Sequence, residues 1–208
     1  MPVEESMNPV RPEFFRQYSL WLVLFGVCLL LQGFDLAKAI QFDRNLLGQG
    51  HIWLALTGHL VHLNWHHFWL NMGGLLLVAI FFSTYCSTLA WVLLLLWSAL
   101  VVSLGLYLLN PELHGYVGLS GVLHGLFIVG AWHEARRHPL SGWVLLILLI
   151  AKLIWEQISG ALPGSESMTG GHVVVDAHLY GAISGVVFVL LHQVIHVNNR
   201  QQNRQHNH

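Results

Sequence analysis

Only 9% of the 208 residues are charged, 55% are hydrophobic, and the net charge is −1 with the histidines neutral. Soluble domains carry about 25% charged residues, so this composition excludes a water-soluble globular domain. The near-zero charge argues against a nucleic-acid partner. Apolar runs of about 15–20 residues recur along the whole chain. The sequence therefore predicts an all-α polytopic membrane protein that contacts membrane lipids.

Six apolar segments are predicted to span the membrane. They are separated by loops, charged turns and breaks such as Asn110-Pro111, because proline interrupts a helix. The spans cover about residues 18–32, 62–83, 88–108, 118–133, 141–158 and 173–196. Residues 17–197 are thus predicted to form one six-helix domain. It is flanked by a flexible tail over 1–16 and a polar, disordered tail over 198–208, with a mixed loop at 33–57 and a Gly/Ser-rich loop at 159–172.

The first span could be mistaken for a secretory signal peptide. Ala37-Lys38-Ala39 has the small-x-small form of a cleavage site. Three glutamates precede the apolar run, however, where a signal peptide is basic, and Asp35 lies between the run and that site. We therefore expect this segment to be retained as a span.

The charge distribution predicts the orientation. Six spans put both termini on one side of the membrane. That side, with the 134–140 turn, holds six arginines, whereas the opposite side holds only Lys38 and Arg44. The positive-inside rule then places both termini in the cytoplasm, and Ser120 lies about one helical turn below the outer surface.

Ser120 and His178 are predicted to meet near the outer surface. Each lies close to the outer end of its span, so the two have similar depths. Glycines accompany both residues, and small residues let membrane helices approach closely. A serine is inert until a base lies within hydrogen-bond reach, so the pattern predicts a Ser–His catalytic dyad. The other interpretation is ordinary helix packing around an intramembrane histidine. The glycines are Gly118, Gly121, Gly125, Gly181 and Gly185.

Oxyanion donors are predicted on the second span. His67 and Asn71 stand at i and i+4, so they share one helical face at the depth of Ser120. A serine hydrolase needs such donors for its oxyanion. His62, earlier in the chain, is expected to brace the loop before this span.

The fifth span carries two charges, Lys152 and Glu156, at i and i+4. Charges inside a membrane usually face protein or water. They either form a structural ion pair or, in the functional interpretation, Glu156 helps to hold the substrate. No carboxylate is obviously placed to complete a catalytic triad, because Asp176 is two residues from His178 and points elsewhere on the helix.

Three motifs in this order resemble the rhomboid family of intramembrane serine proteases. They are His62-x4-His67-x3-Asn71, then Gly118-x-Ser120-Gly121, then Ala177-His178-x2-Gly181-x3-Gly185. The resemblance implies Ser120 as nucleophile and His178 as general base, with an oxyanion hole from the Ser120 N–H, His67 and Asn71. It implies no cofactor and no metal. His124 occupies a position that is usually aromatic in the family, and the first loop lacks the usual Trp-Arg pair.

Further details resemble the rhombosortase branch of that family. These are GLSGVLHGL, DAHLYG and Lys152-x3-Glu156 before a Gly-rich loop. The branch implies cleavage of single-span, membrane-anchored secreted proteins at a C-terminal Gly-Gly sorting segment, with water or an amine as acceptor. It also implies the bacterial inner membrane, with the active site towards the periplasm. A general rhomboid protease with other single-span clients remains the alternative.

Two other function classes fit parts of the sequence. His62-x3-His66-His67 and His192-x3-His196 resemble the histidine boxes of membrane di-iron enzymes, since clustered histidines bind transition metals. The two sets are predicted at opposite membrane faces, which argues against a shared metal site. A non-catalytic rhomboid-like protein that binds client spans is the third class, and the presence of both Ser120 and His178 argues against it.

Overall fold

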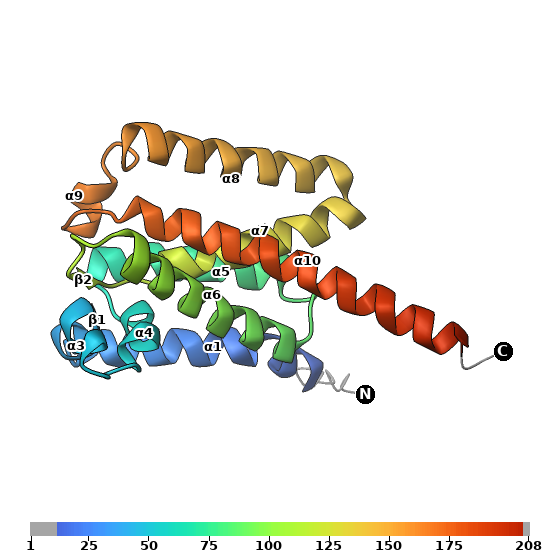
Figure 1. Cartoon of the computed structure of the whole chain (residues 1–208), viewed down its shortest axis with the longest axis horizontal. Coiled ribbons are helices and arrows are strands. Elements are labelled where there is room, and N and C mark those ends of the chain that lie inside the picture. Colours follow the sequence, from blue (N-terminus) through green and yellow to red (C-terminus); the bar gives the residue numbers. More distant parts are fainter. Residues whose placement is uncertain (1–11, 206–208) are drawn as a thin grey trace, which may run out of the picture.

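The computed structural model describes residues 12–205, and the side chains of residues 17–193. Six long helices build the bundle shown in Figure 1, where α1 lies along one edge and α8 along the opposite edge. α1 begins and α10 ends at the same end of the bundle. The long helices are α1 (Pro12–Gly33), α5 (Trp65–Phe82), α6 (Thr88–Leu109), α7 (Ser120–Arg137), α8 (Pro139–Ser159) and α10 (Val175–Gln205).

The all-α membrane fold is confirmed. Within the described residues, α5, α6, α8 and the first part of α10 (Val175–Gln193) are long and apolar enough to cross a membrane. The apolar part of α1, Gln17–Gly33, is slightly shorter. α7 is more polar than these, since it carries Ser120 and His124 and ends in charged residues. It contacts α5, α6, α8 and α10, and His124 is buried among them, whereas the arginines at its end are exposed.

Both predicted tails are shorter than expected. α1 already begins at Pro12, a residue that suits the first turn of a helix because its missing N–H needs no partner there. α10 continues to Gln205, so the prediction of disorder from residue 198 is wrong over 198–205. No Gly or Pro occurs between residues 186 and 205 to end the helix. The remaining tail residues, 1–11 and 206–208, lie outside the description.

Short elements fill the segments predicted as loops and gather at one end of the bundle (Figure 1). β1 and β2 form a two-stranded antiparallel pair in which Phe42 faces Tyr116. The residues predicted as a Gly/Ser-rich loop contain one helical turn, α9. These elements are α2 (Ala37–Ile40), β1 (Phe42–Asp43), α3 (Arg44–Gly48), α4 (Leu54–Thr57), the 3₁₀ turn η1 (Gly58–Leu60), β2 (Gly115–Tyr116) and α9 (Ser165–Thr169).

Arg44 attaches the segment between α1 and α5 to the end of α6. Its guanidinium donates to the carbonyl oxygens of Leu106, Tyr107, Asn110 and Leu113 at 2.7–3.0 Å. The last carbonyls of a helix have no partner within the helix, and a cation at that end also suits the helix dipole. Arg44 therefore helps to hold the 33–60 segment, which the sequence predicted only as a mixed loop, against α6, as does the Ser103 hydroxyl, which donates to the Ala55 carbonyl at 2.6 Å.

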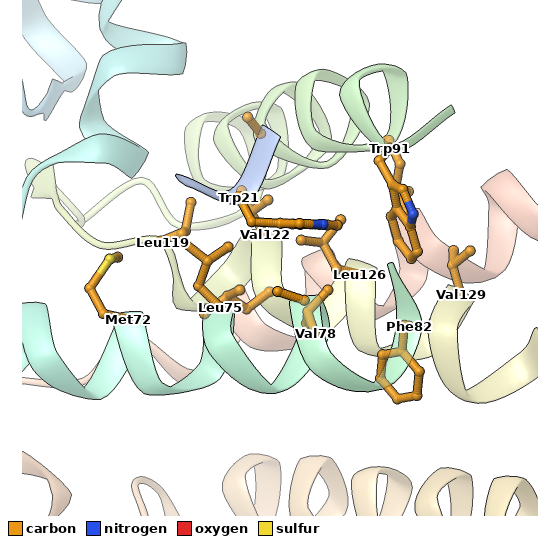
Figure 2. Close-up of a cluster of buried hydrophobic side chains, with 14 of the residues drawn as sticks. Trp21, Met72, Leu75, Val78, Phe82, Trp91, Leu119, Val122, Leu126 and Val129 are labelled. Atoms are coloured by element: carbon orange, nitrogen blue, oxygen red, sulfur yellow. The ribbon is translucent and has the colours of Figure 1, made fainter. Parts of the chain in front are cut away.

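The largest apolar core joins α1, α5, α6 and α7. In Figure 2 the labelled side chains of α5 and α7 interleave beneath Trp21. Trp21 meets the edge of Trp91 with ring centroids 5.4 Å apart, and Leu126 is fully buried between the helices. Close packing of this kind holds α7 in place from the side opposite to α8.

Candidate active site

Ser120 and His178 meet at the end of the bundle that carries the short elements. Ser120 is the first residue of α7, and His178 lies in the first turn of α10. The Ser120 Oγ is 2.9 Å from the His178 Nε2. His178 is buried, whereas Ser120 is half-buried. The pair thus has the geometry that a base needs to take the proton of a serine hydroxyl.

Four glycines let α7 and α10 approach closely beside this pair. A Cβ added to Gly125 would lie 2.9 Å from the Gly181 carbonyl oxygen, and one added to Gly185 would lie 2.6 Å from the Gly125 carbonyl oxygen. A Cβ on Gly121 would come within 2.9 Å of the backbone of the residue before His178. We call Gly121, Gly125, Gly181 and Gly185 the glycine seam. It brings together the two faces that the sequence predicted to meet.

The turn into α7 depends on Gly118. Its φ of +120° is a conformation that residues with a Cβ rarely adopt. Tyr116 donates its hydroxyl to the Gly118 carbonyl at 3.0 Å, and burial raises the pKa of Tyr116 to about 12, so the hydroxyl stays protonated. Tyr116 was not among the predicted site residues. Its place in a strand before the glycine gave no signal of this contact.

Glu156 supplies the carboxylate that the sequence analysis did not find. Its Oε2 lies 3.0 Å from the His178 Nδ1, and its Oε1 accepts from the Lys152 Nζ at 2.6 Å. Asp176, in contrast, accepts from Asn110 at the end of α6. Sequence spacing could not reveal the contact, because α8 and α10 are separated by the 160–174 segment. An ionisable residue within a membrane helix was the available signal.

His124 stacks on His178. The two rings are 4.3 Å apart at centroids and inclined by 19°. The His124 Nδ1 lies 2.7 Å from the Ser120 carbonyl oxygen, and its Nε2 lies 3.0 Å from the Lys152 Nζ. Lys152 is therefore bound on both sides inside the protein.

His67 and Asn71 lie in the same site, on one face of α5. The His67 Nδ1 accepts from the Leu63 N–H at 3.4 Å, which leaves the proton on Nε2. That nitrogen faces Gly118, where an added Cβ would be 2.8 Å away. Asn71 donates one amide hydrogen to the His67 carbonyl at 2.9 Å, and its second amide hydrogen has no partner among the described residues. Both side chains are buried beside Ser120.

His62 packs behind these residues. Its ring meets the rings of His67 and Phe68 edge-on, with centroids 5.1 and 5.5 Å away. Burial first, and the neighbouring His67 second, lower the pKa of His62 to about 3, so the ring is neutral. His62 thus packs against α5 behind the site, and its expected bracing of the loop before this span stays a prediction.

A cavity of about 640 Å³ opens onto Ser120 and continues into the bundle between α5 and α8. Its inner part is apolar, and its outer rim includes residues of α9 and the segment that follows it. The polar groups of the site lie at one end of this apolar space. The apolar lining comes from Leu70 of α5, from Leu123 and Phe127 of α7, and from Leu145, Leu148 and Leu149 of α8.

The sequence of residues 49–193 matches the Rhomboid domain family. The chain belongs to the rhomboid family. Its membership implies an intramembrane serine protease. Uncharacterized proteins of Mycobacterium bovis and Mycobacterium tuberculosis are 27% identical to it over 201 residues, an alignment that covers 87% of this chain and 77% of each relative.

The described part of this rhomboid contains one three-residue set suited to a metal, made of His124, Glu156 and His178, whose donor atoms lie within 4.8 Å of one another. The Lys152 ammonium contacts two of its members, so a cation already lies within it. The histidine boxes do not assemble among the described side chains: His66 is exposed, away from the buried His62. The side chain of His196 lies outside the description.

Proposed function

We propose that this rhomboid is a serine endopeptidase in which Ser120 is the nucleophile and His178 the general base. The proposal rests on one observation: a Ser120 Oγ 2.9 Å from the His178 Nε2, at the polar end of an apolar cavity. A substrate span lying in the cavity would present its outer end to Ser120. Unwinding there is easy at glycines, because a glycine is less favourable in a helix than alanine by about 1 kcal/mol and adopts many backbone conformations.

In the reaction, Ser120 Oγ attacks the scissile carbonyl carbon and its proton passes to His178 Nε2. The oxyanion accepts from the Ser120 N–H, the His67 Nε2–H and the free amide hydrogen of Asn71. Each such donor contributes roughly 10²–10³ in rate in soluble serine proteases. His178 then protonates the leaving amine, and water or an amine acceptor releases the acyl group from Ser120.

The substrate class in this proposal is that of rhombosortases: secreted proteins anchored by a C-terminal span that follows a Gly-Gly segment. Small client residues suit the narrow surround of Ser120, where α7 and α10 approach closely along the glycine seam. The arginine distribution supports an inner-membrane protein with cytoplasmic termini and a periplasmic active site.

The catalytic assignment is tested by labelling the purified protein with a fluorophosphonate and by following cleavage of a single-span client. Ser120→Ala and His178→Ala should each abolish both reactions, and the double variant should be no worse than either, because the two residues act in one step. Ser141→Ala, at the opposite end of the bundle, is the matched control and should label normally. Labelling that persists in Ser120→Ala would refute the assignment.

The substrate class is tested on the client. Replacing its two glycines by leucine should abolish cleavage, because leucine is bulkier and resists unwinding. Replacing the basic residues after its span should disturb the client's orientation instead. A leucine client that is still cut at the same bond would leave a general rhomboid protease whose specificity lies elsewhere.

A further inference from the structure

Five groups form a closed hydrogen-bonded ring around the candidate nucleophile. Ser120 Oγ contacts His178 Nε2, His178 Nδ1 contacts Glu156, Glu156 contacts Lys152, Lys152 contacts His124 Nε2, and His124 Nδ1 returns to the Ser120 carbonyl. The five distances lie between 2.6 and 3.0 Å. We call this set the ring. It joins α7, α8 and α10.

Chemistry fixes the direction of every bond in the ring. A carbonyl oxygen only accepts, so the His124 Nδ1 must carry a proton and its Nε2 must accept. An ammonium only donates, so Lys152 gives one hydrogen to His124 and another to Glu156. An ionised carboxylate only accepts, so the His178 Nδ1 must carry a proton. The remaining nitrogen of His178, Nε2, is then an acceptor that faces the Ser120 hydroxyl.

The Glu156 carboxylate needs these partners because it is buried. Glu156 is 3% exposed and lies in a membrane helix, where an unpaired charge is costly. Its two oxygens each hold a different partner, Lys152 and His178, so the carboxylate is both neutralised and oriented. Lys152 is partly exposed to the cavity, with 30% of its side chain accessible. Both ends of the carboxylate are therefore occupied before any substrate arrives.

We propose that Glu156 is a positioning residue that holds His178 with its proton on Nδ1, and that Lys152 holds the other end of the residue 156 side chain and so determines which of its two terminal atoms faces His178. The inference rests on the proposed protease function, to which it adds a third member. When Ser120 attacks, its proton goes to His178 Nε2, and the imidazolium that results is stabilised by the Glu156 carboxylate. Glu156 keeps its negative charge throughout.

The variant Glu156→Gln tests the direction of the hydrogen bond between residue 156 and the His178 Nδ1. Lys152 can only donate, so it selects the amide oxygen and turns the amide NH₂ towards His178. The NH₂ donates to Nδ1, which moves the proton of His178 to Nε2 and removes the acceptor for Ser120. Loss of the correct tautomer in a serine protease costs about 10⁴ in rate, so the fluorophosphonate acylation rate should fall at least 100-fold.

The double variant Glu156→Gln/Lys152→Met separates this account from a structural role. Without the ammonium, the amide is free to turn its oxygen to the His178 Nδ1–H, which restores the working tautomer. The double variant should therefore acylate at least tenfold faster than Glu156→Gln alone. The labelled step is balanced: Ser120 Oγ bonds to phosphorus, its proton goes to His178, and fluoride leaves.

The outcomes of these experiments distinguish a failure of the positioning role of Glu156 from a failure of the protease function. A fall of less than 100-fold in Glu156→Gln, or a recovery of less than tenfold in the double variant, would overturn the positioning role while Ser120→Ala remained inactive. A wild-type protein that the probe does not label at Ser120 would overturn the protease function itself. Melting temperatures of all variants are measured in the same detergent, because Glu156→Gln leaves Lys152 without its charge partner and the second substitution can restore stability. Labelling rates are therefore compared at a temperature where every variant is folded.

A measurement on the wild-type protein keeps the test independent of variant folding. In ¹⁵N-histidine spectra, assigned by comparison with His178→Gln, His178 should carry its proton on Nδ1. The opposite tautomer would overturn the proposal without any substitution at Glu156.

Discussion

Gly185→Ala should lower activity through the distance between two helices, although residue 185 does not touch the substrate. The added Cβ would lie 2.6 Å from the Gly125 carbonyl oxygen, where real Cβ atoms stay beyond 3.0 Å and are comfortable from 3.4 Å. The difference requires α7 and α10 to separate by about 0.4–0.8 Å, a strain typical of overpacked interiors. Carried along the glycine seam, this separation stretches the Ser120–His178 contact from 2.9 Å to about 3.3–3.7 Å, around the limit of a hydrogen bond.

Because a misplacement of about 1 Å can cost 10²-fold in rate, we expect Gly185→Ala to slow fluorophosphonate labelling roughly tenfold. Gly73→Ala in α5 is the matched control, since a Cβ there meets nothing within 4 Å. It adds the same methyl group to a membrane helix and should label at the wild-type rate. If Gly185→Ala labels as fast as Gly73→Ala, close approach at the seam does not control the geometry of the pair.

Three further predictions concern other contacts. Asn71→Ala should lower kcat for a client by about 10²-fold with little change in KM, because it removes an oxyanion donor; weakened binding at normal kcat would assign Asn71 to substrate docking instead. Arg44→Ala should reduce the free energy of unfolding by about 2–3 kcal/mol, since it strands carbonyls at the end of α6, and an unchanged denaturation curve would contradict this. Lys152→Ala removes the ammonium that lies among a carboxylate and two imidazoles, which are groups that bind zinc. Low zinc concentrations should therefore inhibit labelling of the variant more than labelling of the wild type, and a chelator should reverse the inhibition. Equal sensitivity of the two proteins to zinc would refute this.

The sequence predicted the six long helices because each consists of an apolar run with visible breaks. It also predicted that Ser120 and His178 would meet, since depth along a membrane helix follows from residue number. The structure agrees with that placement, and it puts His67 and Asn71 in the same site.

The contact between Glu156 and His178 escaped prediction for a physical reason, although Glu156 was expected to form an ion pair with Lys152 or to help hold the substrate. Its contact with His178 depends on how α8 is rotated and how far it lies from α10, and neither quantity follows from the apolar pattern of one helix. The same holds for Arg44, whose four acceptors come from the end of α6 and the segment after it. The extension of α10 to Gln205 was missed because a polar composition was taken to indicate disorder, although glutamine and arginine are good helix formers.

α8 lines the cavity and also carries Glu156, so a movement of this helix changes both features together. Leu145, Leu148 and Leu149 make it one wall of the apolar cavity, while Glu156 on the same helix holds the base. An outward swing of α8 would draw Glu156 away from His178, and its return would restore the contact. A client would then enter while α8 is displaced and His178 lacks its carboxylate partner, and Ser120 would become reactive only when α8 returns. The hydroxyl would therefore stay unreactive while the cavity is open to water.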